Sequence, residues 1–301
     1  MPSGLLIAQL ALYAPLTLPT LYLLFRHGRL GLLAWFYLLA FCVLRVTGAA
    51  MGLHDPHNTG AQILSSIGLS PLLLAIDGVL HEARIYCLSP SQRTEWTFMA
   101  LIHVLVATGV AMVGAGAGGL LGDTPKPSDL SNIKVGMVLL EVAWGVLAGW
   151  GLWTRWDGRG SGWKSGDAPA GLARREGWVL LIGTLLALPL VEVSVIYMLV
   201  AQFTQRADLN PMTGGLAVRV VLGFLPELLA AMVLVVVGIV TRKVGNAGAG
   251  AGEAGLGQGH GHGHGHGHGQ GRQHRHAHAH RHGRRRSSSK HGTRLPSRSH
   301  E

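Results

Sequence analysis

The chain has 301 residues, of which 48% are hydrophobic and only 13% are charged, and its formal net charge is +10. A charged fraction about half of the usual ~25% excludes an ordinary water-soluble domain. The charge is also uneven, because the residues before Gly245 hold 16 Lys and Arg against 13 Asp and Glu, whereas the remaining residues hold 9 against 2. The high net charge therefore belongs largely to a C-terminal tail, and the rest of the chain has the composition of a membrane protein.

Seven apolar segments follow one another along residues 1–243, and each is about long enough to cross a bilayer core, which takes roughly 20 helical residues. They predict an all-α, polytopic membrane protein with seven transmembrane helices. The expected spans cover about residues 5–25, 30–53, 61–80, 97–121, 135–153, 178–203 and 216–240. Prolines inside the first, third, sixth and seventh spans predict kinks.

The loops between these spans differ in their content of Lys and Arg. The longest expected internal loop, residues 154–176, is strongly basic, whereas the expected loop 123–132 on the other side of the membrane is not. One side of the membrane receives eleven Lys and Arg and the other three, which predicts an extracytoplasmic N-terminus and a cytoplasmic C-terminus. The eleven are Arg26, Arg29, Arg84, Arg93, Arg155, Arg159, Lys164, Arg174, Arg175, Arg242 and Lys243.

Four charged residues fall well inside the spans, where an ionised group costs about 2.5–3.5 kcal/mol on insertion scales. Counted at 1.5 Å per residue, Arg45 lies roughly 12 Å and Glu141 roughly 9 Å below the outer surface of the hydrocarbon core. Glu192 and Glu227 both lie roughly 16 Å down, near the midplane. Together they predict one intramembrane polar layer.

Two functions are open for this layer. In the first, Arg45 pairs with Glu141 in a cavity open to the outside. Glu192 and Glu227 then hold at least one proton between them, and they bind a proton, a cation or a cationic ligand. In the second, the same groups only tie helices together. Asp77 and His103 form a second expected layer near the cytoplasmic side.

Small residues recur at four-residue spacing in two of the spans. Gly145 and Gly149 form one such pair, and Gly114 and Gly118 form another. This spacing allows membrane helices to approach closely, so we expect these glycines to pack within the bundle. The two cysteines provide no disulfide framework, and we expect two unpaired thiols.

From Gly245 on, the chain consists mainly of Gly, Ala, His, Arg and Ser and is expected to be disordered. Its imidazoles bind zinc, nickel or copper in principle, either as a metal store or incidentally in a low-complexity repeat. The first run of these candidate ligands comprises His260, His262, His264, His266 and His268. The basic cluster Arg284–Arg286 suits anionic lipid or a cytoplasmic partner, and a tail tethered to the bilayer makes nucleic acid an improbable partner.

No catalytic motif stands out. The chain lacks a nucleophile elbow, a phosphate-binding glycine loop and a helical His-Glu-x-x-His motif. We therefore expect no enzymatic activity and no cofactor. The seventh span also lacks the lysine that a retinal-binding opsin requires.

Several short motifs stand out in combination: Arg26–Gly28, Phe41–Ala49, Ile67–Leu72, Leu188-Pro189, Tyr197 and Glu227. Together they resemble a family of fungal seven-span integral membrane proteins of unknown function. The resemblance covers about Leu5 to Lys243, and it implies the seven-span topology and a fungal source but no activity or active-site residues. Glu192 and Ser194 stand where that family often has a basic residue before the tyrosine of the sixth span.

The sequence leaves three functions open. A receptor-like or sensory protein is favoured by the seven spans and the long cytoplasmic segments. A transporter or lipid-translocating protein is favoured by the intramembrane carboxylates and the prolines within spans. A metal-handling protein is the third alternative, because of the His-rich tail.

Overall fold

The computed structural model describes residues 3–55, 58–88, 91–122, 124–160, 168–211 and 213–241. Within these ranges all regular structure is helical, and no strand is present. Seven helical segments are long and apolar enough to cross a membrane, which confirms the predicted fold class of a multi-pass membrane protein. These segments are Gly4–Arg26, Gly31–His54, Thr59–Leu88, Arg93–Leu120, Pro127–Asp157, Arg174–Thr204 and Leu216–Thr241.

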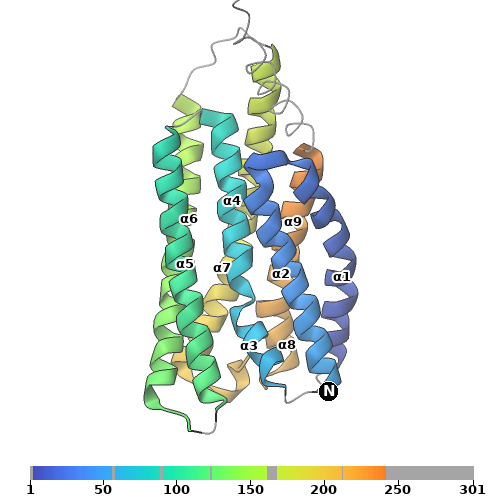
Figure 1. Cartoon of the computed structure of the whole chain (residues 1–301), viewed down its shortest axis with the longest axis vertical. Helices are drawn as coiled ribbons and strands as arrows, with labels where there is room; N and C mark the ends of the chain where they lie inside the picture. The colour runs from blue at the N-terminus through green and yellow to red at the C-terminus, as the bar shows by residue number, and fades with distance from the viewer. Residues whose placement is uncertain are drawn as a thin grey trace, which may run out of the picture. The chain divides into compact units, whose positions relative to one another are not determined.

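Successive spans run antiparallel to one another (Figure 1). We call the end of the bundle where α1 begins the N-terminal end, and the other the opposite end. The α-helices are α1 (Ser3–Arg26), α2 (Gly28–His54), α3 (Thr59–Ile67), α4 (Leu69–Leu88), α5 (Gln92–Leu120), α6 (Pro127–Gly160), α7 (Ala168–Thr204), α8 (Leu216–Val218) and α9 (Leu225–Thr241). The 3₁₀ turn η1 (Ala207–Leu209) precedes α8, and the π-helical segment η2 (Arg219–Phe224) joins α8 to α9.

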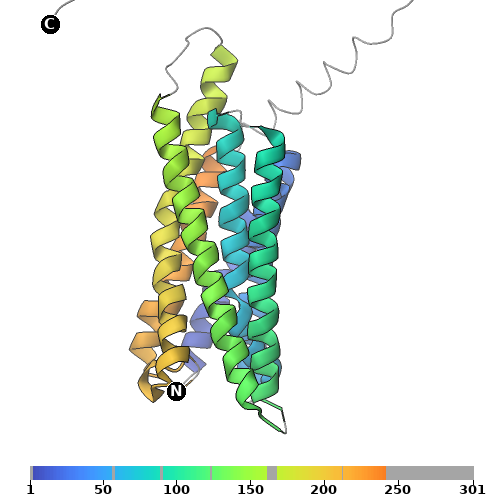
Figure 2. The same ribbon diagram turned by 90° about the vertical axis from the view of Figure 1, so that its left-hand side faces the viewer.

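Helix α4 is the centre of the bundle. It contacts α2, α5, α6, α7 and α9, and most of its residues are buried. Figure 2 shows α5, α6 and α7 packed side by side along one flank. Large apolar side chains such as Leu18, Phe25 and Val104 point outward and are highly exposed. An outer surface of this kind is stable in lipid and aggregates in water.

The third span consists of two helices. Helices α3 and α4 meet at Gly68, three residues before Pro71. Pro71 has no N–H to donate to the carbonyl of Ile67, and the hydroxyl of Ser70 donates to that carbonyl instead, at 2.6 Å. The predicted kink in this span therefore takes the form of a break.

The seventh span is irregular at a corresponding depth. Its turns from Arg219 to Phe224 are π-helical, and Pro226 is the second residue after them. The hydroxyl of Ser194 on α7 donates to the carbonyl of Gly223 in this segment, at 3.3 Å. A wide turn of this type spreads its side chains apart and is frequent at functional sites.

Several helices extend beyond the predicted spans. Helix α4 continues to Leu88 and α5 begins at Gln92, so the charged residues expected in the connecting loop are helical. Likewise, α6 continues to Gly160 and α7 begins at Ala168, within the expected 154–176 loop. Hydropathy marks only the hydrocarbon-spanning part of a helix, whereas hydrogen bonding continues into the polar layer.

The predicted packing role of the paired glycines is wrong for three of the four. A Cβ at Gly145, Gly149 or Gly118 would meet no atom within 4 Å, whereas a Cβ at Gly114 would contact Ile67 at 3.9 Å. The close contact between α5 and α6 occurs elsewhere, since a Cβ at Gly136 would lie 2.5 Å from the carbonyl oxygen of Gly109. Four-residue spacing alone does not say which side of a helix faces a neighbour.

Gly78 marks the close crossing of α4 and α2. A Cβ at this position would lie 2.6 Å from the Cα of Ala34, so the backbones would have to separate. We predict that Gly78→Ala lowers the free energy of unfolding by about 1–3 kcal/mol, measured by thermal unfolding in detergent. Gly145→Ala is the matched control and should be neutral or slightly stabilising, because its Cβ is unobstructed. Equal stability of the two variants would contradict this crossing.

Candidate ligand cavity

A cavity of about 380 Å³ lies at the N-terminal end of the bundle. Residues of α1, α2, α3, α7, η2 and α9 line it, together with Pro211 and Thr213 from the loop before α8. This volume is at the low end of the roughly 300–1,000 Å³ of small-molecule sites. The two irregular places in the spans, at Gly68 and at η2, both lie beside it.

An ion pair lies deep in this cavity. The guanidinium of Arg45 on α2 contacts the carboxylate of Glu227 on α9, and their side chains are only 10% and 8% exposed. The depths of the charged residues predicted a pair of Arg45 with Glu141, and this prediction is wrong, because the partner of Arg45 is Glu227. The guanidinium also lies over the ring of Phe41, 5.4 Å from its centroid. Gly68 leaves room for this group, since a Cβ there would lie 3.1 Å from Arg45 Cζ.

Two other polar side chains line the cavity without a partner among the described residues. Arg219 makes no ion pair, and its buried Nε has no hydrogen bond. The hydroxyl of Tyr197 also lacks a hydrogen bond, although this side chain is only 5% exposed. The Nε of Arg45 is a third unsatisfied donor. A buried polar group of this kind costs about 1–3 kcal/mol unless a partner arrives.

Glu141 and Glu192 lie outside the cavity. Their carboxyl groups face each other between α6 and α7, and both side chains are half-buried. One turn along the helices, the indole of Trp144 donates to the carbonyl of Leu188 at 2.9 Å. The predicted four-residue layer is therefore divided into the Arg45–Glu227 pair and this carboxyl pair.

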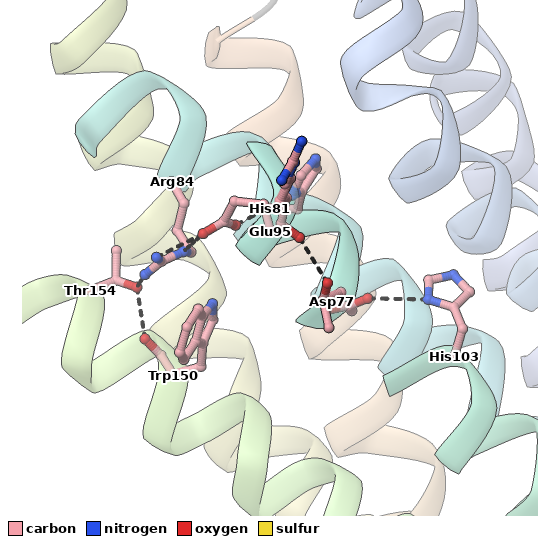
Figure 3. A network of polar contacts seen from close by, with 9 residues as sticks. Asp77, His81, Arg84, Glu95, His103, Trp150 and Thr154 are labelled. Atoms are coloured by element: carbon pink, nitrogen blue, oxygen red, sulfur yellow. Dashed lines mark hydrogen bonds and ion pairs between the residues drawn. The ribbon is translucent and has the colours of Figure 1, made fainter. Parts of the chain in front are cut away.

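The other predicted layer contributes to a buried network nearer the opposite end (Figure 3). Asp77 Oδ2 lies 3.4 Å from His103 Nδ1, so the structure brings these two residues together. His103 Nδ1 also lies 2.8 Å from the carbonyl oxygen of Met99. One turn after Asp77 on α4, His81 Nδ1 lies 3.5 Å from Oε2 of Glu95 on α5.

Arg84 is the best-satisfied charge of this network. Its Nε donates to Glu95 Oε1 at 2.9 Å, and its guanidinium lies 4.3 Å from the ring centroid of Trp150. It also donates to the hydroxyl of Thr154, which in turn donates to the carbonyl of Trp150 at 2.7 Å. The space beside this network is too small for a water molecule. These contacts join α4, α5 and α6.

His27, in the turn between α1 and α2, forms a further buried ionic contact. Its Nδ1 lies 2.9 Å from Glu82 Oε1, and its Nε2 donates to the carbonyl of Gly238 at 2.9 Å. Neither His27 nor Glu82 is exposed. Gly28, with a φ of 67°, makes the turn that directs the imidazole inward.

Sequence reasoning missed the contacts of His27, Glu82, Arg84 and Glu95. His27 belongs to the basic turn Arg26–Arg29, Glu82 and Arg84 to the end of the third expected span, and Glu95 to the polar stretch before the fourth, all places where charged side chains normally face water. No sequence signal distinguishes them from exposed residues. Only the pairing of distant segments places them in the interior.

No three His, Cys, Asp or Glu side chains gather into a metal site in the part of the chain that the structure describes. His260, His262, His264, His266 and His268, the predicted tail ligands, lie outside the described residues. Cys42 and Cys87 are both free and buried.

A family model described as "Domain of unknown function (DUF7702)" matches residues 2–244, which include all seven spans. The chain therefore belongs to this family. The comparisons with curated proteins and with solved structures found no match.

The contact between His27 and Glu82 predicts a pH-dependent stability. Burial lowers the pKa of His27, but the hydrogen bond and charge of Glu82 outweigh it and raise this pKa above its ordinary 6.5. The stabilisation is therefore complete below pH 6.5 and is lost as the pH rises through the raised pKa. We predict that the unfolding temperature in detergent falls across this window. His27→Gln should flatten the profile, whereas the exposed control His54→Gln should keep it; an unchanged slope in His27→Gln would exclude this source.

The Arg45–Glu227 pair predicts a non-additive response to mutation. Either Arg45→Met or Glu227→Met leaves a buried charge unpaired, at a cost of about 3–5 kcal/mol, while the double variant removes both charges. We predict that the double variant is more stable than either single one, measured by thermal unfolding in detergent. Additive losses would show that the two groups do not interact.

Proposed function

We propose that this member of the DUF7702 family is a receptor-like membrane protein that binds a small ligand in the cavity at its N-terminal end. The observation that carries the proposal is a cavity at one end of the bundle that has a packed apolar layer on its interior side. Its deep part holds the Arg45–Glu227 pair and unsatisfied donors. A concave, largely apolar site with a few convergent polar groups is the usual form of a ligand site.

The interior between the cavity and the opposite end supports binding in preference to passage. Tyr13 and Phe41 pack edge to face with ring centroids 5.4 Å apart, and neither side chain is exposed. Trp35 and Leu38, which lie on α2 between Phe41 and the opposite end of the bundle, are also fully buried. A ligand in the cavity would meet this packed layer before it reached the His27–Glu82 contact.

The distribution of Lys and Arg supports an orientation with the N-terminus outside and the C-terminus in the cytoplasm. The cavity then faces the extracytoplasmic side, and the buried ionic network lies near the cytoplasm. Helix α9 connects the cavity to the His27–Glu82 contact, because Glu227 contacts Arg45 while the carbonyl of Gly238 accepts from His27. Displacement of α9 by a ligand would therefore reach both. The sequence resemblance supports a fungal source, and the basic tail suits a cytoplasmic partner or anionic lipid.

Transport is the second candidate, and the facing carboxyls of Glu141 and Glu192 favour it. Proton relays in transporters use carboxyls within the membrane, and here two of them face each other. A transporter must open the site to each side in turn, whereas a receptor of the proposed type opens it to one side. This difference is measurable.

The test is cysteine accessibility in a background with Cys42→Ala and Cys87→Ala. Ser65→Cys places a thiol in the cavity wall, Thr213→Cys marks the N-terminal end, and Trp156→Cys marks the opposite end. We predict that a membrane-impermeant maleimide labels Ser65→Cys only from the side that labels Thr213→Cys. In oriented vesicles that side should be extracytoplasmic.

Labelling of Ser65→Cys also from the side that labels Trp156→Cys would overturn the receptor proposal in favour of transport. Glu192→Gln would then be the next variant, since a relay through this carboxyl should fail while the protein still reaches the membrane. Labelling of Thr213→Cys from the cytoplasm would reverse the proposed orientation.

A further inference from the structure

We infer that the ligand of this cavity is an amphiphilic monoanion, a carboxylate with an apolar body. The inference rests on the proposed function and names the chemical class of its ligand. It comes from the charge balance of the cavity, the directions of its free donors and the nature of its walls.

The charges that line the cavity do not cancel. Arg45 and Arg219 contribute two guanidinium groups, and Glu227 contributes the carboxylate that pairs with Arg45. Arg219 has no carboxylate partner among the described residues. Each guanidinium stays ionised in a protein, so the cavity carries one excess positive charge. One anionic group balances it, whereas the cationic ligand considered in the sequence analysis would be repelled.

The free hydrogen-bonding groups are donors of the type that an oxyanion accepts. Arg219 Nε and Arg45 Nε are buried and unsatisfied, and both side chains line the cavity. The Tyr197 hydroxyl adds a third donor from α7, on a side chain that is more than nine-tenths buried. Guanidinium and hydroxyl groups together hold a planar carboxylate by charge-assisted hydrogen bonds. The resident Glu227 disfavours a dianion such as a phosphate monoester at neutral pH.

The rest of the lining favours an apolar body. Leu5, Leu6, Leu44, Leu64, Met198 and Phe224 supply most of the wall. Gly52 lets the wall close tightly, since a Cβ there would lie 3.3 Å from a methyl carbon of Leu6. A ligand with the carboxylate at Arg219 and its chain along these side chains satisfies both parts of the site. A medium-chain fatty acid has this form.

The π-helical segment η2 explains why Arg219 points into the cavity. Arg219, Gly223 and Phe224 all belong to it, and all three line the site. If this segment were α-helical, Arg219 would be rotated about the helix axis relative to Glu227, because each residue of an α-helix turns by about 100°. The wide turn therefore places the free guanidinium and the ion pair on one cavity.

The test is equilibrium binding of radiolabelled decanoate to the full chain in nanodiscs of zwitterionic lipid, with empty nanodiscs subtracted. We expect saturable binding that unlabelled decanoate displaces, that decanol displaces weakly and that decylamine does not displace. Acetate separates the two parts of the site, because it carries the same headgroup without the chain. Weak displacement by acetate supports a chain-binding wall.

Arg219→Gln is the decisive variant, because no carboxylate pairs with its side chain in the part of the chain that the structure describes. We expect at least a roughly tenfold loss of decanoate affinity without a fall in the unfolding temperature, and partial recovery in Arg219→Lys. Arg206→Gln is the matched control at the same end of the bundle, since Arg206 pairs with Asp208 on the surface at 66% and 59% exposure. It should bind decanoate as the unchanged protein does.

Tighter binding of decylamine than of decanoate, or no saturable decanoate binding, would overturn the ligand class. Equal displacement by acetate would overturn the apolar body, and equal affinity of Arg219→Gln would overturn the role of Arg219. The accessibility of Ser65→Cys is measured without ligand. One-sided labelling together with a failed decanoate assay would thus remove this inference while leaving the proposed receptor architecture in place.

Discussion

Charge inside an apolar bundle must be compensated, and this constraint organises the protein. An unpaired ion in the membrane interior is expensive, whereas a paired and hydrogen-bonded one is tolerated. Arg45 and Glu227 join α2 to α9 in this way, and Arg84 and Glu95 join α4 to α5. The contact of His27 with Glu82 joins the α1–α2 turn to α4. Apolar contacts alone would let these helices rotate against one another in lipid, because lipid tails are as apolar as the helix surfaces.

Arg219 is the exception that points to function. It lines the cavity and forms no ion pair with a carboxylate among the described residues, while Arg45 and Arg84 each have such a partner. A packed ionic network stabilises a single arrangement of helices, whereas unsatisfied donors beside a cavity favour binding of a ligand that supplies the acceptor. Buried polar atoms without a hydrogen bond occur at both ends, including His81 Nδ1 and His103 Nε2 in the ionic network. The two ends differ in space: the network is packed too tightly to hold a water molecule, whereas the unsatisfied donors of the N-terminal end line a cavity.

The backbone irregularities follow the same division. Gly68 breaks the third span and the π-helical segment widens the seventh, and both lie beside the cavity. Ser70 and Ser194 satisfy carbonyls at these two places with their hydroxyls, so the irregular backbone is compatible with the membrane interior. Pro71 and Pro226 therefore mark places where a span departs from regular α-helical geometry, whereas α1 and α7 continue without interruption through Pro15, Pro19 and Pro189.

The sequence by itself determined the number and position of the spans, because the cost of exposing a backbone in lipid forces every long apolar segment to be helical. It also indicated that Arg45, Glu227, Asp77 and His103 lie at depths where they need partners. It did not determine the partners. Glu141 and Glu227 were both reachable by depth for Arg45, and only the rotation of each helix about its axis selected Glu227.

The tertiary structure decided the remaining points for the same reason. Depth along a helix follows from 1.5 Å per residue, but the direction of a side chain depends on the neighbours that its helix contacts. Those neighbours turned His27 inward from a turn that reads as basic and exposed, left Gly145 facing outward, and gathered Arg219, Tyr197 and the ion pair around one cavity. The sequence determined the depth of each charged residue along its helix, whereas the packing of the helices determined which charged residues pair.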